Sequence, residues 1–311
     1  MIVDINGARI HYRREGAGFP ILMFHAGIAD SRMWQPQADE FAKQFDVIRP
    51  DMRGFGDSEL PARRWSPVGD VIGLMDELEL KPAHLIGCSL GGRLAIDLAL
   101  DHPARVSKLV LVGPAVSGDS FGKKYPEVFA EVRAAAAAND LEALNQAEAR
   151  LFLDGPGRAR GYVGGEVREL FLDMNRRDMR NDLESAPMDE LDPPAVGRLR
   201  EITAPTLVLI GDEDIPSVFD RVDLVMDSIK GARKVVIHDA AHLPNLEHPA
   251  EFNRFVLDFL LRKAAAAASQ HRRWPLTLSS RLNRTTTMVG AAFSMASLIA
   301  GSRPERSVTG L

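Results

Sequence analysis

Short apolar runs alternate with longer amphipathic segments through residues 20–116 of the chain. Runs such as residues 21–24 and 83–86 are typical of strands buried on both faces, and the longer segments are typical of helices. This alternation predicts βαβ units and a parallel sheet with helices on both faces. Residues 2–24 precede it as strands, with Asn6-Gly7 as a hairpin turn.

Residues 117–196 interrupt the alternation. Their composition is helical over residues 134–138, 141–152 and 166–174, and glycines and prolines punctuate the segments between. No strong strand pattern occurs there. We therefore predict a helical insertion, flanked by an α/β core formed from residues 1–116 and 197–263.

Residues 264–311 differ in composition from the rest. They hold six arginines against one glutamate, a net charge of +5, whereas the whole chain carries −5. The segment is rich in Ser, Thr and Ala and lacks an amphipathic period, which predicts a disordered basic tail. Residues 288–301 are mildly apolar but too few to span a bilayer, so an interfacial or partner-binding segment is the alternative and no stable membrane insertion is expected.

The sequence Gly87-Cys88-Ser89-Leu90-Gly91 lies between a strand-like run and a helix-like run. This is the G-x-S-x-G pattern in a strand, turn and helix context. Such a turn holds the serine in a strained conformation and exposes its Oγ at the carboxyl edge of the sheet. The pattern predicts Ser89 as a nucleophile.

A serine hydroxyl is a weak nucleophile and needs a base that a carboxylate orients. A predicted strand at residues 206–210 ends at Asp212 and Asp214, and a second at residues 234–237 is followed by a loop that contains His242. Both therefore lie at the sheet edge where ligands bind. We predict His242 as the base and Asp214 as the orienting acid, with Asp212 as the alternative.

Five motifs occur in an order that resembles the α/β-hydrolase-fold enzymes, over residues 1 to about 263. They are His25-Ala26-Gly27, Asp51 to Ser58, the serine turn, Gly211 to Asp214, and Ala241-His242 with Glu247-His248-Pro249. The resemblance implies a mostly parallel eight-stranded sheet with helices on both faces. It also implies that residues 117–196 form an inserted helical cap over the active-site mouth.

The resemblance likewise implies that Ser89 is the nucleophile, Asp214 the triad acid and His242 the general base. It implies that the backbone N–H groups of Leu90 and Gly27 form the oxyanion hole. Ala26 stands where the family commonly has glycine, which leaves Ala26 open as the second donor.

The cap is expected to supply substrate contacts. The candidates are Phe121, Tyr125 and Phe152, together with Trp34 in the helix after the oxyanion loop. Packing within the cap or the core is the alternative reading for each of them.

Composition and charge narrow the class of partner. The net charge of −5 and the pI of about 5.9 give no basic footprint for nucleic acid. Cys88 is the only cysteine, no metal-ligand spacing occurs, and no metal or organic cofactor is expected. The N-terminus lacks a signal-peptide pattern, so a cytoplasmic location is expected.

These features predict a carboxylic-ester hydrolase that cleaves a small, largely apolar ester or lactone through an acyl-enzyme intermediate. The Ser-Leu-Gly-Gly sequence and the cap resemble enol-lactone hydrolases. Two alternatives stay open: a carbon–carbon bond hydrolase of ring-cleavage products, and a slow-turnover ligand receptor on the same fold. A small-molecule substrate is the expected partner, and the oligomeric state is left open.

Overall fold

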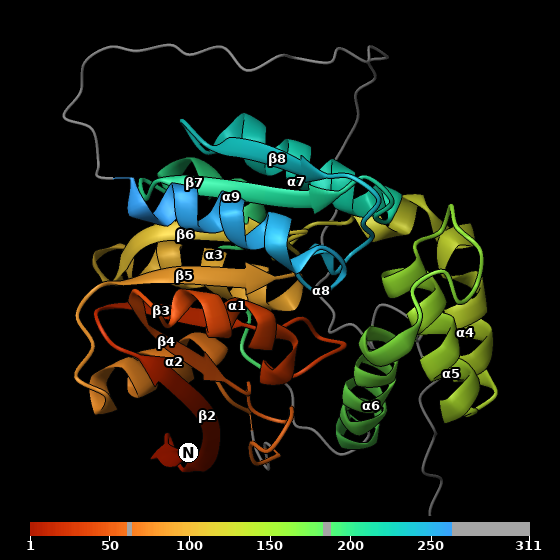
Figure 1. Ribbon diagram of the computed structural model, residues 1–311, viewed down its shortest axis with the longest axis horizontal. Helices are drawn as coiled ribbons and strands as arrows, with labels where there is room; N and C mark the ends of the chain where they lie inside the picture. Colours follow the sequence, from red (N-terminus) through yellow and green to blue (C-terminus); the bar gives the residue numbers. More distant parts are fainter. Residues whose placement is uncertain (61–63, 183–187, 263–311) are drawn as a thin grey trace, which may run out of the picture.

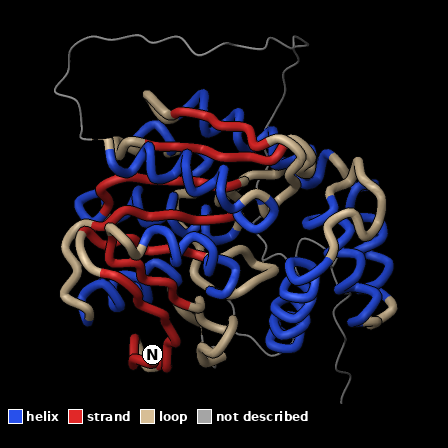
Figure 2. The backbone as a smooth tube through the Cα atoms, in the orientation of Figure 1, coloured by secondary structure: helices blue, strands red, loops and turns tan. Residues whose placement is uncertain are grey.

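A computed structural model describes residues 1–60, 64–182 and 188–262. Its centre is one eight-stranded sheet with the strand order β1-β2-β4-β3-β5-β6-β7-β8 (Figures 1 and 2). The strands are β1 (Ile2–Ile5), β2 (Ala8–Gly16), β3 (Phe19–Phe24), β4 (Phe45–Pro50), β5 (Ala83–Cys88), β6 (Val106–Val112), β7 (Thr206–Gly211) and β8 (Arg233–Ile237).

The sheet is parallel from β4 to β8, whereas β1 and β2 pair antiparallel. The β1–β2 turn has positive φ at both central residues, 51° at Asn6 and 76° at Gly7, as a two-residue hairpin requires. The sheet and its helices confirm the predicted fold class. Parallel strands place all their carboxyl ends on one edge, where the candidate site forms.

Helices cover both faces of the sheet (Figure 1). Helix α1 packs against α9 on one face and α2 packs against α3 on the other. The helices are α1 (Gln35–Phe41), α2 (Pro67–Glu77), α3 (Leu90–Asp101), α4 (Ala130–Ala137), α5 (Leu141–Glu148), α6 (Gly165–Asp182), α7 (Pro216–Ser228), α8 (Pro244–Glu247) and α9 (Pro249–Leu261). Helix α2 begins where its sequence indicates, because Ser66 Oγ accepts the Gly69 N–H at 3.0 Å.

Helices α4, α5 and α6 lie beyond the carboxyl ends of the strands, apart from the main body (Figure 1). A π-helical turn, η5 (Ala149–Asp154), follows α5, and short 3₁₀ turns η3 (Phe121–Lys124) and η4 (Pro126–Phe129) precede α4. The described part of residues 117–196 holds no β-strand. Ion pairs join α6 to the core, one between Arg32 and Asp173 at 2.7 Å and one between Asp57 and Arg177.

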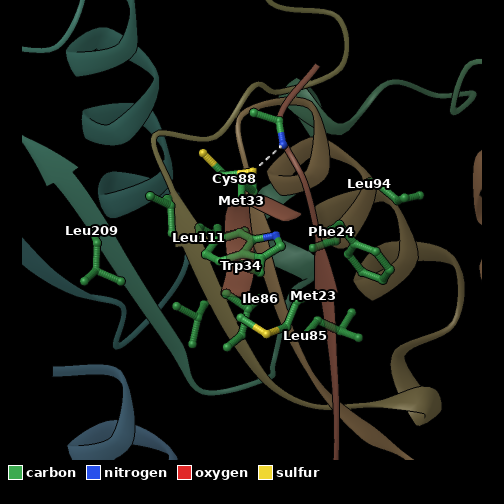
Figure 3. Packing of buried hydrophobic residues seen from close by; sticks show 14 of the residues in the cluster. Met23, Phe24, Met33, Trp34, Leu85, Ile86, Cys88, Leu94, Leu111 and Leu209 are labelled. Atoms are coloured by element: carbon green, nitrogen blue, oxygen red, sulfur yellow. Dashed lines mark hydrogen bonds between the residues drawn. The ribbon is translucent and has the colours of Figure 1, made fainter. Parts of the chain in front are cut away.

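Trp34 is part of the hydrophobic core. It ends a 3₁₀ turn, η1 (Ser31–Trp34), and its side chain is fully buried, with its ring centroid 6.1 Å from that of Phe252 in α9. Figure 3 shows it within the packed apolar side chains that cover the sheet. The structure thus packs Trp34 against α9 within the core, and its predicted contact with substrate stays a prediction.

None of the described helices has both the length and the apolarity that crossing a bilayer requires. The tail predicted over residues 264–311 lies outside the described residues, and its disorder stays a prediction.

Candidate active site

Ser89 forms a strained turn between β5 and α3. Its φ is 52° and its ψ is −111°, a conformation that costs a non-glycine residue about 1–3 kcal/mol. The glycines around it are required by close backbone approach. A Cβ on Gly87 would lie 2.2 Å from the Gly91 carbonyl oxygen, and one on Gly91 would lie 2.2 Å from that of Phe24. The local sequence therefore permits the sharp turn at Ser89, although the structure buries the residue where the sequence pattern predicts an exposed Oγ.

The loop after β6 fixes the backbone of Ser89. The Ser89 N–H donates to the Val112 carbonyl at 2.9 Å, and the Ala115 N–H donates to the Ser89 carbonyl at 3.0 Å. Because the N–H and the carbonyl of Ser89 are both hydrogen-bonded, the surrounding fold sets the direction of its side chain.

His242 and Asp214 form a buried pair. His242 Nδ1 lies 2.9 Å from Asp214 Oδ1 and 3.0 Å from Oδ2. Asp214 Oδ1 also accepts the Ile215 N–H at 2.7 Å. Because a carboxylate only accepts, Nδ1 carries the proton and Nε2 is the ring atom able to take one.

Asp212, the alternative acid, lies elsewhere. Its Oδ2 is 2.8 Å from Nδ1 of His238, whose side chain is 84% exposed. The structure therefore brings His242 together with Asp214 and not with Asp212.

The serine and histidine loops meet around Gly113. A Cβ on Gly113 would lie 3.1 Å from Asp214 Oδ2 and 3.2 Å from His242 Nδ1. Cys88 Sγ, next to the serine, donates to the His242 carbonyl at 3.8 Å. Among the described residues, His242 Nε2 has no hydrogen-bond partner, so the structure records no bond from Ser89 Oγ. Such bonds are often long in unliganded enzymes and tighten when substrate binds.

Two backbone N–H groups are candidates for the oxyanion hole. Leu90 begins α3, so its N–H has no partner within the helix. The Ala26 N–H donates to Met33 Sδ at 3.3 Å, inside the core. This bond directs the Ala26 N–H into the core and away from a substrate, which leaves the Gly27 N–H as the second candidate.

His25 braces the oxyanion loop. Its Nδ1 donates to the Ala26 carbonyl at 2.8 Å, and its Nε2 accepts the Met52 N–H at 2.9 Å. Burial lowers the pKa of His25 and keeps the ring neutral, as this bonding pattern requires. The loop is thus tied to the turn after β4.

Phe152 is the aromatic candidate that the structure places at the site. Its ring centroid is 5.4 Å from that of His242, and its carbonyl accepts the His242 N–H at 3.1 Å. Because Phe152 belongs to η5, the helical insertion predicted as a cap contacts the candidate base at this point.

Phe121 and Tyr125 make other contacts. Tyr125 Oη donates to Asp220 Oδ2 in α7 at 3.1 Å. The Lys124 ammonium lies 4.4 Å from the centroid of the Phe121 ring and bonds the same aspartate. These contacts attach the start of the insertion to α7, and none of them involves the acid–base pair.

Sequence reasoning missed a buried ion pair beside His242. Arg158 Nη1 lies 3.2 Å from Glu247 Oε2, although 89 positions separate the two residues. Burial raises the pKa of Glu247 to about 7. The motif Glu247-His248-Pro249 drew attention to the position without indicating a partner.

A cavity of about 90 Å³ opens beside Leu90, lined mainly by apolar side chains. Ser89 and His242 are not among its lining residues, so it adjoins the candidate oxyanion hole rather than the acid–base pair. Arg93 in its wall pairs with Asp97 at 3.5 Å and with Glu190. The polar lining residues are Ser66, Arg93, Asp97, Asp101, Asp189 and Glu190. The apolar lining residues are Met52, Phe55, Trp65, Pro67, Val68, Leu90, Leu94, Met188 and Leu191.

One grouping within the described ranges has the composition of a metal site, His11 with Asp51 and Asp57. Protein donors already occupy both oxygens of Asp51: Oδ1 accepts the Ser31 N–H at 2.8 Å and Oδ2 accepts the Asp57 N–H at 3.0 Å. These bonds describe a brace between the loops after β3 and β4, and we assign no metal to it.

The chain matches the family model for the alpha/beta hydrolase family over residues 21–255. It is 34% identical over 283 residues to a 2-hydroxymuconate semialdehyde hydrolase of Pseudomonas sp. (strain CF600), covering 85% of this chain and 94% of that protein. It is 30% identical over 270 residues to a 2-hydroxy-6-oxo-6-phenylhexa-2,4-dienoate hydrolase of Comamonas testosteroni, covering 84% and 94%.

Among solved structures, the enol-lactonase from Burkholderia xenovorans LB400 superimposes with a TM-score of 0.69 at 28% identity, covering 84% of this chain and 100% of that one. The eight-stranded sheet, the positions of Ser89, Asp214 and His242 after strand ends, and the match over residues 21–255 all point to the same family. The protein belongs to the alpha/beta hydrolase family.

Proposed function

We propose that the protein is a serine hydrolase that cleaves a small carboxylic ester or lactone through an acyl-enzyme on Ser89. One observation carries the proposal: a strained, turn-held serine and a buried histidine whose Nδ1 is held by Asp214 both follow strand ends at the same edge of the sheet. A nucleophile, a base and an orienting acid from three separate strand ends are the parts that acyl transfer needs.

The chemistry follows from these positions. His242 Nε2 accepts the Ser89 proton as Oγ attacks the acyl carbon, and Asp214 stabilises the imidazolium. The N–H groups of Gly27 and Leu90 bind the oxyanion, and the loss of one such donor typically costs about 10²–10³ in kcat. The leaving oxygen takes the proton from Nε2. Water, deprotonated by the same nitrogen, then releases the acid and restores the serine.

The surroundings favour a small and neutral acyl group. The arginines that line the cavity and the His242 loop already have counter-ions: Arg93 pairs with Asp97, and Arg158 pairs with Glu247. Phe152 covers the imidazole, and the cavity beside Leu90 is largely apolar. The similarity to the enol-lactonase supports the same class of substrate.

Carbon–carbon bond hydrolysis is the second candidate, because relatives at 34% and 30% identity are named as hydrolases of 2-hydroxymuconate semialdehyde and of a phenylhexadienoate. The same three residues would serve it. The difference is that carbon leaves instead of oxygen, so a proton must reach a carbon atom before the bond breaks.

A substrate panel separates the candidates. We would compare kcat/KM for p-nitrophenyl butyrate, an enol lactone and 2-hydroxy-6-oxo-6-phenylhexa-2,4-dienoate, with Ser89→Ala as the control. The proposal predicts that the ester or the lactone exceeds the dienoate by at least tenfold. The opposite order would favour the second candidate, and a single acylation without turnover would favour the receptor alternative.

A further inference from the structure

One arginine of the cap contacts both ends of the loop that carries His242. Arg158 Nη2 donates to Asp239 Oδ1 at 2.9 Å, on the β8 side of the loop. Arg158 Nη1 donates to Glu247 Oε2 at 3.2 Å, at the end of α8. The guanidinium therefore bridges the entrance and the exit of the loop.

Glu247 carries this contact to the residue before the base. Its other oxygen, Oε1, accepts the Ala241 N–H at 2.8 Å. The N–H of His242 itself donates to the carbonyl of Phe152 in the cap. The two consecutive N–H groups that precede the His242 Cα are thus held by Glu247 and by Phe152, and both contacts bear on the orientation of the imidazole.

The cap holds Arg158 rigidly. The buried Asp154 carboxylate accepts the N–H groups of Gly161 at 2.8 Å and Val163 at 3.1 Å, and this closes the turn that contains Arg158. The guanidinium carbon lies 4.4 Å from the centroid of the Tyr162 ring. An arginine held in this way transmits the position of the cap to the loop beneath it.

The turn lies directly on the catalytic loops. A Cβ on Gly155 would lie 2.5 Å from the Glu213 carbonyl and 3.2 Å from the Ala241 Cβ. The φ of Gly155 is +86°, which also requires glycine. The cap and the loops that carry the acid and the base therefore meet with no room for a side chain between them.

The pair is buried and sensitive to the loss of either partner. The Arg158 and Glu247 side chains are 6% and 3% exposed. Removing one partner of such a pair leaves an uncompensated buried charge. Burial raises the pKa of Glu247 to about 7 and Arg158 opposes that rise, so loss of the arginine would raise the pKa of Glu247 further.

We propose that Arg158 and Glu247 are positioning residues through which the cap sets the orientation of His242. The inference rests on the proposed function, because it takes His242 as the base. Neither residue is assigned a contact with substrate. Through this pair, the position of the cap on the core determines the orientation of the His242 ring. The catalytic site is therefore fully assembled only when the cap is in place.

The test compares Arg158→Gln and Glu247→Gln with Arg177→Gln, a control that removes an ion pair between α6 and Asp57, away from His242. The readouts are kcat and KM for p-nitrophenyl butyrate and the rate at which a fluorophosphonate labels Ser89, well below each melting temperature. Misplacement of the base predicts a roughly 10- to 100-fold loss of kcat and of labelling rate, with KM within about threefold. The control should stay within about twofold of the wild type.

Two further variants separate positioning from simple stabilisation. The double variant Arg158→Gln/Glu247→Gln should lose little more than the worse single variant, because both changes remove one contact. Arg158→Lys should recover only part of kcat, since an ammonium cannot bridge Asp239 and Glu247 as the planar fork does. A lower melting temperature with unchanged kcat and labelling rate in both Gln variants would overturn the inference.

The same experiment distinguishes failure of the inference from failure of the proposed function. If His242→Ala is labelled and turns over as fast as the wild type, His242 is not the base and both proposals fail. If His242→Ala is inactive while Arg158→Gln and Glu247→Gln behave like Arg177→Gln, the proposed function stands and only the positioning role is wrong.

Discussion

Asp214 contacts Nδ1 of His242 through both carboxylate oxygens, at 2.9 and 3.0 Å. This arrangement fixes the tautomer and points Nε2 away from the acid, toward the position where a serine proton is taken. Asp212, two positions earlier, bonds His238 at the surface instead. Asp212 and Asp214, only two positions apart, therefore bind different histidines.

Substitution of the two acids should give unequal losses. Asp214→Asn should lower kcat by about 10⁴-fold, because the amide favours the wrong imidazole tautomer. Asp212→Asn, the matched control, should cost less than about tenfold. Steady-state kinetics on one ester substrate measures both, and the reverse order would make Asp212 the orienting acid.

The length of the acyl chain should show a short optimum. Each methylene buried in an apolar cavity adds about 0.8 kcal/mol at most, and overfilling a packed site costs more than burial returns. We expect kcat/KM for p-nitrophenyl esters to peak at roughly C2 to C6. Leu94→Phe, which narrows the cavity beside Leu90, should move the peak to shorter chains. A profile that rises steadily to long chains would contradict a small acyl pocket.

Lys108 should stabilise the end of α9. Its Nζ donates to the carbonyls of Phe259 at 3.0 Å, Leu260 at 2.8 Å and Arg262 at 2.7 Å, which are free acceptors at a helix C-terminus. Lys108→Met should lower the free energy of unfolding by about 1–2 kcal/mol. Lys43→Met, which removes only an exposed pair with Glu40, should cost less than about 0.5 kcal/mol. Urea denaturation tests the difference, and equal losses would refute the capping role.

His84 should make stability depend on pH. Burial and the nearby Lys108 lower its pKa to about 4 from 6.5. Between these values the unfolded chain binds the proton and the folded protein does not, so this contribution to stability is present above pH 6.5 and lost as the pH falls toward 4.

The matched variant is His84→Phe, since the ring packs 4.4 Å from Phe19 and 6.1 Å from Phe45. Relative to this variant, the wild type should lose on the order of 2 kcal/mol of unfolding free energy between pH 6.5 and 4. Parallel pH profiles for the two proteins would show that His84 does not titrate differently on folding.

The sequence predicted the parts of the site that follow strand ends. Ser89, Asp214 and His242 each come just after a buried apolar run, and parallel strands bring such positions to one edge. The cap was harder to interpret, because helical periodicity does not say which face meets the core. Phe152 therefore could not be distinguished from Phe121.

Trp34 and the Arg158–Glu247 pair show two further limits of prediction from the sequence. An aromatic residue after the oxyanion loop can face either the substrate or the sheet, and no local pattern shows that Trp34 packs against Phe252 of α9. The ion pair joins residues 89 positions apart, and no local pattern marks such a contact. Contacts between the insertion and the core needed the three-dimensional structure.

The central claim is that Ser89 is the nucleophile, and active-site labelling combined with turnover tests it most directly. A fluorophosphonate should modify the wild type once per molecule, at Ser89, and abolish ester hydrolysis in proportion. Ser89→Ala should keep its melting temperature, take up no label and lose at least about 10³-fold in kcat. Labelling or hydrolysis that persists in Ser89→Ala would contradict the account.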